Sequence, residues 1–151
     1  MPTKIEDIYD ALITNVSGAL PDYVRLPNPY DITTSNFLSR TKGYAIEVGP
    51  AVRTDTQINC SVSWERVFIV TIANKITTTE NNTTLRAGVD KALMADHRSL
   101  LEAFYNDLQL SGLAVDADIS DDSGIEIVGE EQKFLGMSIS ILVKYEEDLR
   151  T

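Results

Sequence analysis

A run of alternating apolar residues between Phe134 and Tyr145 constrains the fold more than any other part of the sequence. Every second position in it is apolar: Leu135, Met137, Ile139, Ile141, Val143 and Tyr145. The positions between carry mostly small or polar side chains, with Leu142 as the exception. Successive side chains of a strand point to opposite faces of a sheet, so this pattern predicts a long, central or near-central strand with one face on a core.

Two regions have helical spacing of apolar residues. Thr3 to Val16 predicts an amphipathic helix in which Thr3 and Glu6 form a capping box, and which Gly18 and Pro21 end. We expect this helix to pack on the apolar face of the Leu135–Tyr145 strand. Leu85 to Leu110 is also helical in pattern, but its stripe weakens at Asp96-His97, where Asp96 could cap a second helix. One long helix and two short ones both fit, and we favour two.

The remaining regular segments have the character of strands. They are Tyr23–Leu26, Tyr44–Val48 closed by Gly49-Pro50, Val62–Ala73, and a short one around Ile125, Ile127 and Val128. Val67 to Val70 is apolar on both parities, which indicates a section covered on both faces or buried in an oligomer contact. The segments 31–39, 53–59 and 77–84 are polar and are expected to form loops. The order of elements predicts one α+β domain over residues 1–151, a mostly antiparallel sheet with helices packed on one face.

Composition limits the classes of function. The chain has 151 residues, of which 43% are apolar, enough to bury roughly two thirds of its unfolded surface. Cys60 is the single cysteine, which excludes an intramolecular disulfide and a multi-cysteine zinc site. No apolar run approaches a membrane span and no export leader is recognisable, so we expect a soluble protein that does not bind membranes.

The charge is strongly acidic and unevenly spread. The formal net charge is −10, and residues 96–151 hold thirteen acids against four bases. Binding to a phosphate backbone depends on clustered lysine and arginine, so this balance argues against nucleic-acid binding. It suits a surface that nucleic acid passes without adhering.

Candidate catalytic chemistry is sparse. His97 is the only histidine, no serine stands in a G-x-S-x-G turn, and the glycines form no phosphate-binding pattern. We therefore interpret His97 as a surface residue at a helix start rather than a catalytic base, and expect a role without catalysis, cofactor or metal.

The aspartates Asp116, Asp118, Asp121 and Asp122 invite a calcium reading. Starting an EF-hand loop at Asp116 places Asp121 at the turn glycine and Ile127 at the bidentate glutamate, and starting at Asp118 fails in the same way. We interpret the segment as a solvated acidic loop that lines a lumen or engages a partner.

A second group of residues is of the types enriched at protein interfaces. Trp64 and Arg66 share one strand, Arg53 begins a polar segment, and Tyr30 and Phe37 are aromatics in a long connection. All five are candidate contacts with another subunit or partner, while for Trp64 a plain core position is equally compatible.

The layout resembles the small tail-terminator (tail-completion or neck) proteins of long-tailed bacteriophages. The features that carry the resemblance are the capped helix at Thr3–Val16, the strand in Gly43–Pro50 after a long loop, the Trp64–Ala73 strand, the helical Leu85–Leu110 region and the closing strand at Phe134–Glu146. They span most of the chain, as a matter of length and element order rather than of a single motif.

That resemblance implies a structural protein of the virion neck, assembled in the host cytoplasm. It implies a homo-oligomeric ring, commonly of six copies, that caps the tail tube and joins it to the head connector. DNA passes through such a ring without being specifically bound. A small acidic protein-binding or adaptor domain is the alternative.

Overall fold

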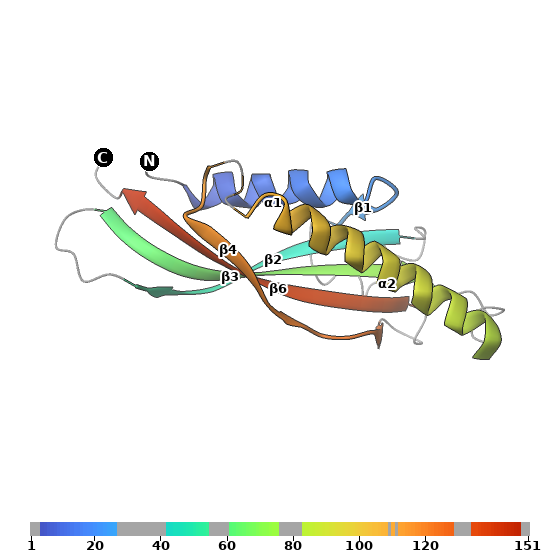
Figure 1. Cartoon of the computed structure of the whole chain (residues 1–151). Coiled ribbons are helices and arrows are strands. Elements are labelled where there is room, and N and C mark those ends of the chain that lie inside the picture. Colours follow the sequence, from blue (N-terminus) through green and yellow to red (C-terminus); the bar gives the residue numbers. More distant parts are fainter. Residues whose placement is uncertain are drawn as a thin grey trace.

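Two helices cover one face of a six-stranded sheet, as the computed structural model shows in Figure 1. It describes residues 4–26, 42–54, 61–75, 83–108, 110, 112–128 and 134–148. The elements are α1 (Ile5–Ala19), β1 (Val24–Arg25), β2 (Lys42–Arg53), β3 (Ser61–Lys75), α2 (Thr83–Tyr105), β4 (Asp116–Asp122), β5 (Glu126–Val128) and β6 (Phe134–Asp148). The predicted α+β class is confirmed.

The centre of the sheet is a long antiparallel pair. The strand order is β1-β2-β3-β6-β4, with β5 also paired to β6, and β1 is the one strand among these that pairs in parallel. β3 and β6 pair without a break from Ser61↔Asp148 to Lys75↔Phe134. The prediction that the alternating segment after Phe134 is a central strand is confirmed.

The core lies between the sheet and the helices. All six alternating residues of β6 are buried, as are Phe68, Val70 and Ile72 of β3. Ile8, Leu12 and Val16 of α1 are fully buried in the same cluster, so this helix packs on the side of the sheet to which the apolar residues of β6 point. Burial of these side chains, at roughly 1.5–3 kcal/mol each, is the main stabilising contribution.

The helix boundaries differ from the predictions. In α1 the N-cap position is Lys4, which makes no side-chain capping bond, and the helix continues through Gly18 to Ala19. Thr3, the other half of the predicted capping box, lies outside the described residues. α2 is one helix, so the preference for two was wrong. Its buried stripe runs Leu93, His97, Leu100 and Phe104, and His97 fills the position where the pattern seemed to fail.

Two strand predictions also need correction. β2 does not end at Gly49-Pro50 but continues to Arg53, because a bulge between Val48 and Ala51 absorbs the proline, which has no N–H to donate. The segment from Asp116 to Asp122 is strand β4 rather than a loop. Of the expected loops, Arg53 and the first residues of α2 are regular structure, while segments 31–39, 55–59 and 77–82 lie outside the described residues.

Gly49 sits where β2 approaches β3 closely. A Cβ at this position would lie 2.7 Å from the backbone oxygen of Val67, which cannot rotate away. We expect Gly49→Ala to lower the free energy of unfolding by about 1–3 kcal/mol in urea titrations. Gly18 is the control: a Cβ there meets no atom within 4 Å, so Gly18→Ala in α1 should raise stability by about 0.5–1 kcal/mol.

Candidate interaction surfaces

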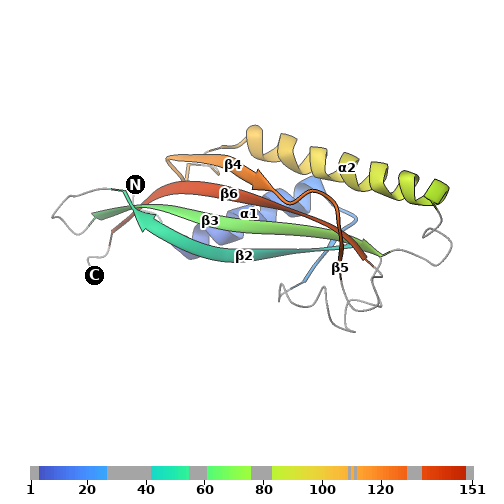
Figure 2. The ribbon, with the colours of Figure 1, turned by 90° about the horizontal axis from the view of Figure 1, so that it is seen from below.

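The face of the sheet opposite the helices is the first candidate surface. Both helices lie above the sheet in Figure 1, and Figure 2 shows the strands unobstructed by them from below. On this back face Val67 lies opposite Leu142, Ile69 opposite Ser140, and Thr71 opposite Ser138. All six of these side chains are half-buried, and Val52 on the same face is 67% exposed. We call Val52, Val67, Ile69 and Leu142 the back-face patch.

Charged side chains flank that patch on one side. Lys144 of β6 lies between Glu65 of β3 and Asp116 of β4 in the register, and its Nζ is 3.4 Å from Glu65 Oε1. Thr71 and Ser138 are joined by a hydroxyl hydrogen bond of 2.8 Å. The patch is thus a bounded apolar area within a polar frame, which is the usual arrangement of an interface.

The four predicted aspartates lie together on β4, at one edge of the sheet. By register Asp116 and Asp118 face the uncovered side together with Asp121, whereas Asp122 faces the helices. Asp116, Asp121 and Asp122 accept backbone N–H bonds from residues just after them, those of Ala117, Asp122 and Gly124. Strand alternation therefore places three of the aspartates on the back face and one on the helix side.

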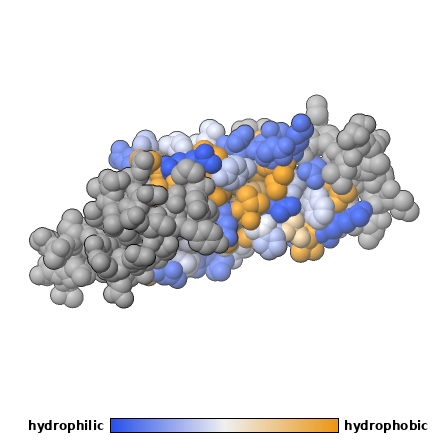
Figure 3. Space-filling view, turned by 180° about the vertical axis from the view of Figure 1, so that it is seen from behind, coloured by the Kyte–Doolittle hydropathy of each residue, from blue (hydrophilic) through white to orange (hydrophobic). Residues whose placement is uncertain are grey.

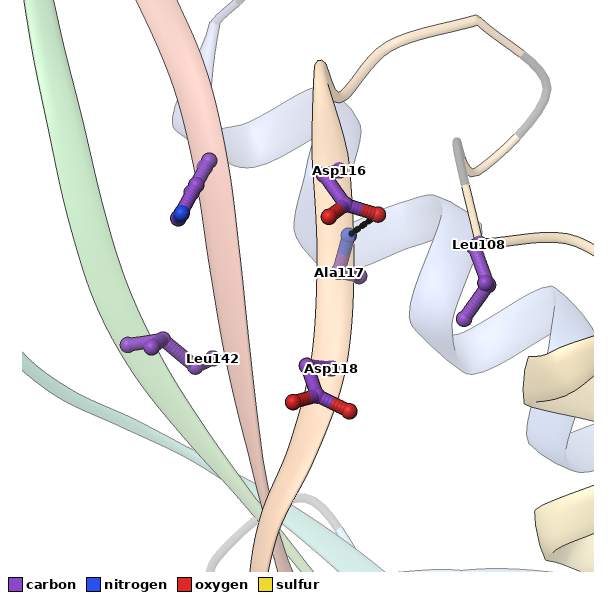
Figure 4. A pocket seen from close by; sticks show the side chains of 6 residues that line it. Leu108, Asp116, Ala117, Asp118 and Leu142 are labelled. Carbon is purple, nitrogen blue, oxygen red and sulfur yellow. Dashed lines mark hydrogen bonds between the residues drawn. The ribbon is translucent and has the colours of Figure 1, made fainter.

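A shallow hollow of about 230 Å³ adjoins two of these aspartates. Figure 4 shows Asp116 and Asp118 along β4, with Leu142 on one side and Leu108 on the other. Lys144 completes the lining. Among the described residues there is no group of three or more histidine, cysteine or acidic side chains that could hold a metal ion.

The Trp64–Arg66 pair is directed inward. The Arg66 guanidinium donates to the Tyr145 hydroxyl at 3.0 Å and to the Gly49 carbonyl at 3.0 Å, so it ties β2, β3 and β6 together. Trp64 is half-buried against the core, and Arg53 lies opposite it in the register. Tyr30 and Phe37 fall outside the described residues. Arg66, predicted as a partner contact, therefore donates two hydrogen bonds within the chain.

His97 was wrongly placed at a helix start on the surface. It lies within α2, is 8% exposed, and its Nε2 is 3.6 Å from Asp122 Oδ2, too far for a hydrogen bond. Its neighbour Asp96 caps no helix but accepts a 2.7 Å bond from the Tyr23 hydroxyl, and Lys42 Nζ lies 4.0 Å from the same carboxylate. The sequence offered no signal for these contacts, which join residues far apart in the chain.

Tyr23 has a hydroxyl that is part-buried and hydrogen-bonded to Asp96. Burial, and then the hydrogen bond to Asp96, raise its pKa above the ordinary value of 10.0. The folded protein keeps this proton at a pH where the unfolded chain loses it, so the contribution to stability is present below about pH 10 and is lost as the pH rises further. We expect the stability difference between the wild type and Tyr23→Phe to shift in favour of the variant above pH 10, measured by urea unfolding at several pH values. An unchanged difference across that range would contradict the assignment.

No helix in the described part of the chain has the length and apolar character needed to cross a membrane.

No family model and no curated protein matches the sequence. Among solved structures, a chain in "Virion of native gene transfer agent (GTA) particle" is similar over 92% of this chain and 91% of its own length, with 12% identity and a TM-score of 0.43. At that score the likeness establishes neither a shared fold nor a shared role.

Proposed function

We propose that this chain is a non-catalytic virion-assembly protein, of the kind that terminates phage tails by forming a ring on the tail tube and joining it to the head connector. The observation that carries the proposal is the back-face patch. Antiparallel sheets tolerate one face in water when that face is polar, but here valine, isoleucine and leucine occupy its middle. An apolar area of this kind on a folded domain is typical of a contact surface.

The elements that carry the family resemblance agree with the proposal. Each of the five segments on which the resemblance to tail terminators rests corresponds to an element of the fold: α1, β2, β3, α2 and β6. The small side chains of β6 on the back face, Ser138 and Ser140, let another layer approach the sheet closely. A closed ring requires two different surfaces that meet between copies, and a sheet with unlike edges and an open face provides unlike surfaces.

The test is the mass and shape of the particle. We expect light scattering and negative-stain images to show a ring, either of the protein alone or after mixing with tail-tube protein. Loss of the protein should leave tails of uncontrolled length. A strictly monomeric chain that binds neither tube nor connector would contradict the proposal.

A pair of variants tests the role of the back face. Ile69→Glu places a charge in the back-face patch. It should raise the protein concentration needed for ring assembly by at least about tenfold, while unfolding remains cooperative. Thr14→Glu introduces the same charge at an exposed position of α1, on the other side of the sheet, and should leave assembly unchanged. Equal assembly by both variants would exclude the patch as the contact.

The exposed aspartates of β4 favour a second candidate, an adaptor for a basic partner. Asp116, Asp118, Asp121 and Asp122 are all exposed along a single strand at the edge of the sheet. Replacing all four by asparagine should abolish binding to such a partner and leave a terminator ring intact. The two candidates therefore separate in one experiment.

A further inference from the structure

Helix α2 has an exposed hydrophobic flank in addition to its buried stripe. Among the described residues, the exposed hydrophobic side chains larger than valine are Met94, at 48%, and Tyr105, at 56%. Both lie on α2, and the half-buried Leu101 lies between them in the sequence. Leu101 and Tyr105 follow Met94 by seven and eleven residues, so at about 100° per residue the three side chains point within about 40° of one another. We call Met94, Leu101 and Tyr105 the α2 flank.

Contacts made by the rest of α2 fix the direction of this flank. Asp96 accepts its hydrogen bond from Tyr23, next to β1. Met94 lies about 160° around the helix from Asp96, so the flank points away from β1. His97 approaches Asp122 of β4 on the side of the helix that carries the flank. Figure 2 shows α2 on the β4 side of the sheet. The α2 flank and the back-face patch are therefore two different surfaces of one chain.

Acidic side chains surround the back-face patch. In the register rows of the patch and the rows next to them, Lys144 is the one described base on the back face. The described acids there are Glu47, Glu65, Asp116, Asp118, Asp121 and Glu146. A surface that covers the patch must therefore bring lysine or arginine around an apolar centre.

The α2 flank has such a border. Lys91 and Arg98 are exposed and lie about 40–60° around the helix from Met94, on its outer side. Arg98 contacts Glu102 at 3.3 Å, but both side chains are exposed, and an exposed pair one helical turn apart is weak. Arg98 can therefore exchange this partner for the acids of another copy.

A second apolar area has the wrong charge for this contact. Ile5, Tyr9 and Val48 line a hollow between α1 and β2 together with Glu6 and Glu47. Figure 3 looks at the side of the molecule on which β2 lies, and hydrophobic atoms gather at the middle of that surface. Its two glutamates would meet the acids around the patch, and like charges across an interface oppose association.

We propose that the back-face patch of one copy binds the α2 flank of the next copy. Met94 and Tyr105 cover the apolar patch, and Lys91 and Arg98 lie among the acids around it. The inference rests on the proposed assembly of copies into a ring, since it names the surface that meets the patch. Each copy contributes a different surface to the contact, so the contact is head to tail, and repeated it closes into a ring or continues as a filament.

Single introduced charges test the flank. Met94→Glu should raise the protein concentration needed for assembly by at least about tenfold, as Ile69→Glu should. Ser99→Glu is the control, because it places the same charge at an exposed position of the same helix, about 140° away from Met94. It should change that concentration by less than about twofold. Cooperative urea unfolding identifies each variant as folded.

A mixture of two defective variants tests the head-to-tail arrangement. Ile69→Glu keeps an intact flank and Met94→Glu keeps an intact patch, so together they should form a one-to-one pair that does not grow, measured by sedimentation velocity and native mass spectrometry. Each variant alone should remain monomeric at the same concentration. Absence of the pair would overturn the proposal. Assembly of Met94→Glu alone, as for the wild type, would also overturn it and would indicate a contact between two patches.

A further pair of variants tests the matching of charge. Glu102→Lys removes the acid beside Arg98 and should lower the assembly concentration about threefold at about 0.05 M salt, a gain that disappears at about 0.5 M. Asp10→Lys makes an equal change of charge at an exposed position of α1 and should have less than half of that effect. Equal gains in both variants would contradict the assigned role of the basic border.

The outcomes separate this contact from the proposed function. Rings formed equally well by the wild type and by Met94→Glu would leave the ring standing and remove the flank from it. A one-to-one pair of the two variants, combined with open filaments of the wild type, would establish the contact and contradict the ring.

Discussion

Phe68→Ala is expected to lower the free energy of unfolding by about 3–5 kcal/mol. Phe68 is 0% exposed and stands at the middle of β3, between Val48 of β2 and Ile141 of β6 in the register. Its removal leaves a cavity beneath the helices that rigid neighbouring strands cannot close. Urea unfolding at one fixed protein concentration, where the assembly state is the same for all variants, measures the change.

The adjacent residue on the same strand provides the control. Ile69 points to the back face and is half-buried, so Ile69→Ala should cost only about 1 kcal/mol in stability. If the two variants were destabilised equally, the back face would be as tightly packed as the core, and the description of it as open would be wrong.

Arg66→Met is expected to cost about 2 kcal/mol or more. The methionine keeps much of the aliphatic stem but removes both donors, and the Tyr145 hydroxyl and the Gly49 carbonyl lose their partner. Tyr145 is 1% exposed, so its hydroxyl has little access to water as a replacement. A double-mutant cycle with Tyr145→Phe should give a coupling of about 1 kcal/mol between the two residues.

Arg98→Met is the matched control for that experiment. Arg98 also contacts a residue of its own chain, Glu102 at 3.3 Å, but both side chains are exposed on α2. An exposed i,i+4 pair contributes about 0.3–0.5 kcal/mol. A loss at Arg66 no larger than that at Arg98 would contradict the structural role assigned to its guanidinium.

The fold class could be predicted because the spacing of apolar residues, every second position in strands and every third or fourth in helices, follows from which side chains are buried. The residues of β6 that alternate in the sequence are buried, and the predicted short strands around Val24 and Ile127 exist. β4 was missed although it has the same signal: Ala117 and Ile119 face the core between outward aspartates. The abundance of acids hid a period of two, since an edge strand can be acidic on its exposed side.

The errors in the helices and in β2 have a different origin. A polar residue in an apolar stripe suggests that the helix ends there. His97 is nevertheless buried within α2, where the packing accommodates an imidazole. Gly49-Pro50 reads as a turn, but a bulge lets the strand pass. Burial of one polar group and accommodation of one extra residue are decided by tertiary packing, which local patterns do not contain.

The candidate sites were less predictable than the fold. The aspartates were identified, but their division between two faces of β4 follows from the register with β6. Arginine is common at interfaces, but the residue type alone does not show whether the side chain points to solvent or into the protein. Arg66 points into the protein.

The uninterrupted pairing of β3 with β6 has a consequence for how the chain folds during synthesis. α2, β4 and β5 all lie between these two strands in the sequence, so β3 leaves the ribosome well before its main partner. Until β6 emerges, β3 has a free edge and an apolar face without its central neighbour. Contacts so distant along the chain also slow folding. The nascent chain therefore passes through a stage in which β3 is prone to mispair, and chaperone binding to that segment should decline as β6 is released.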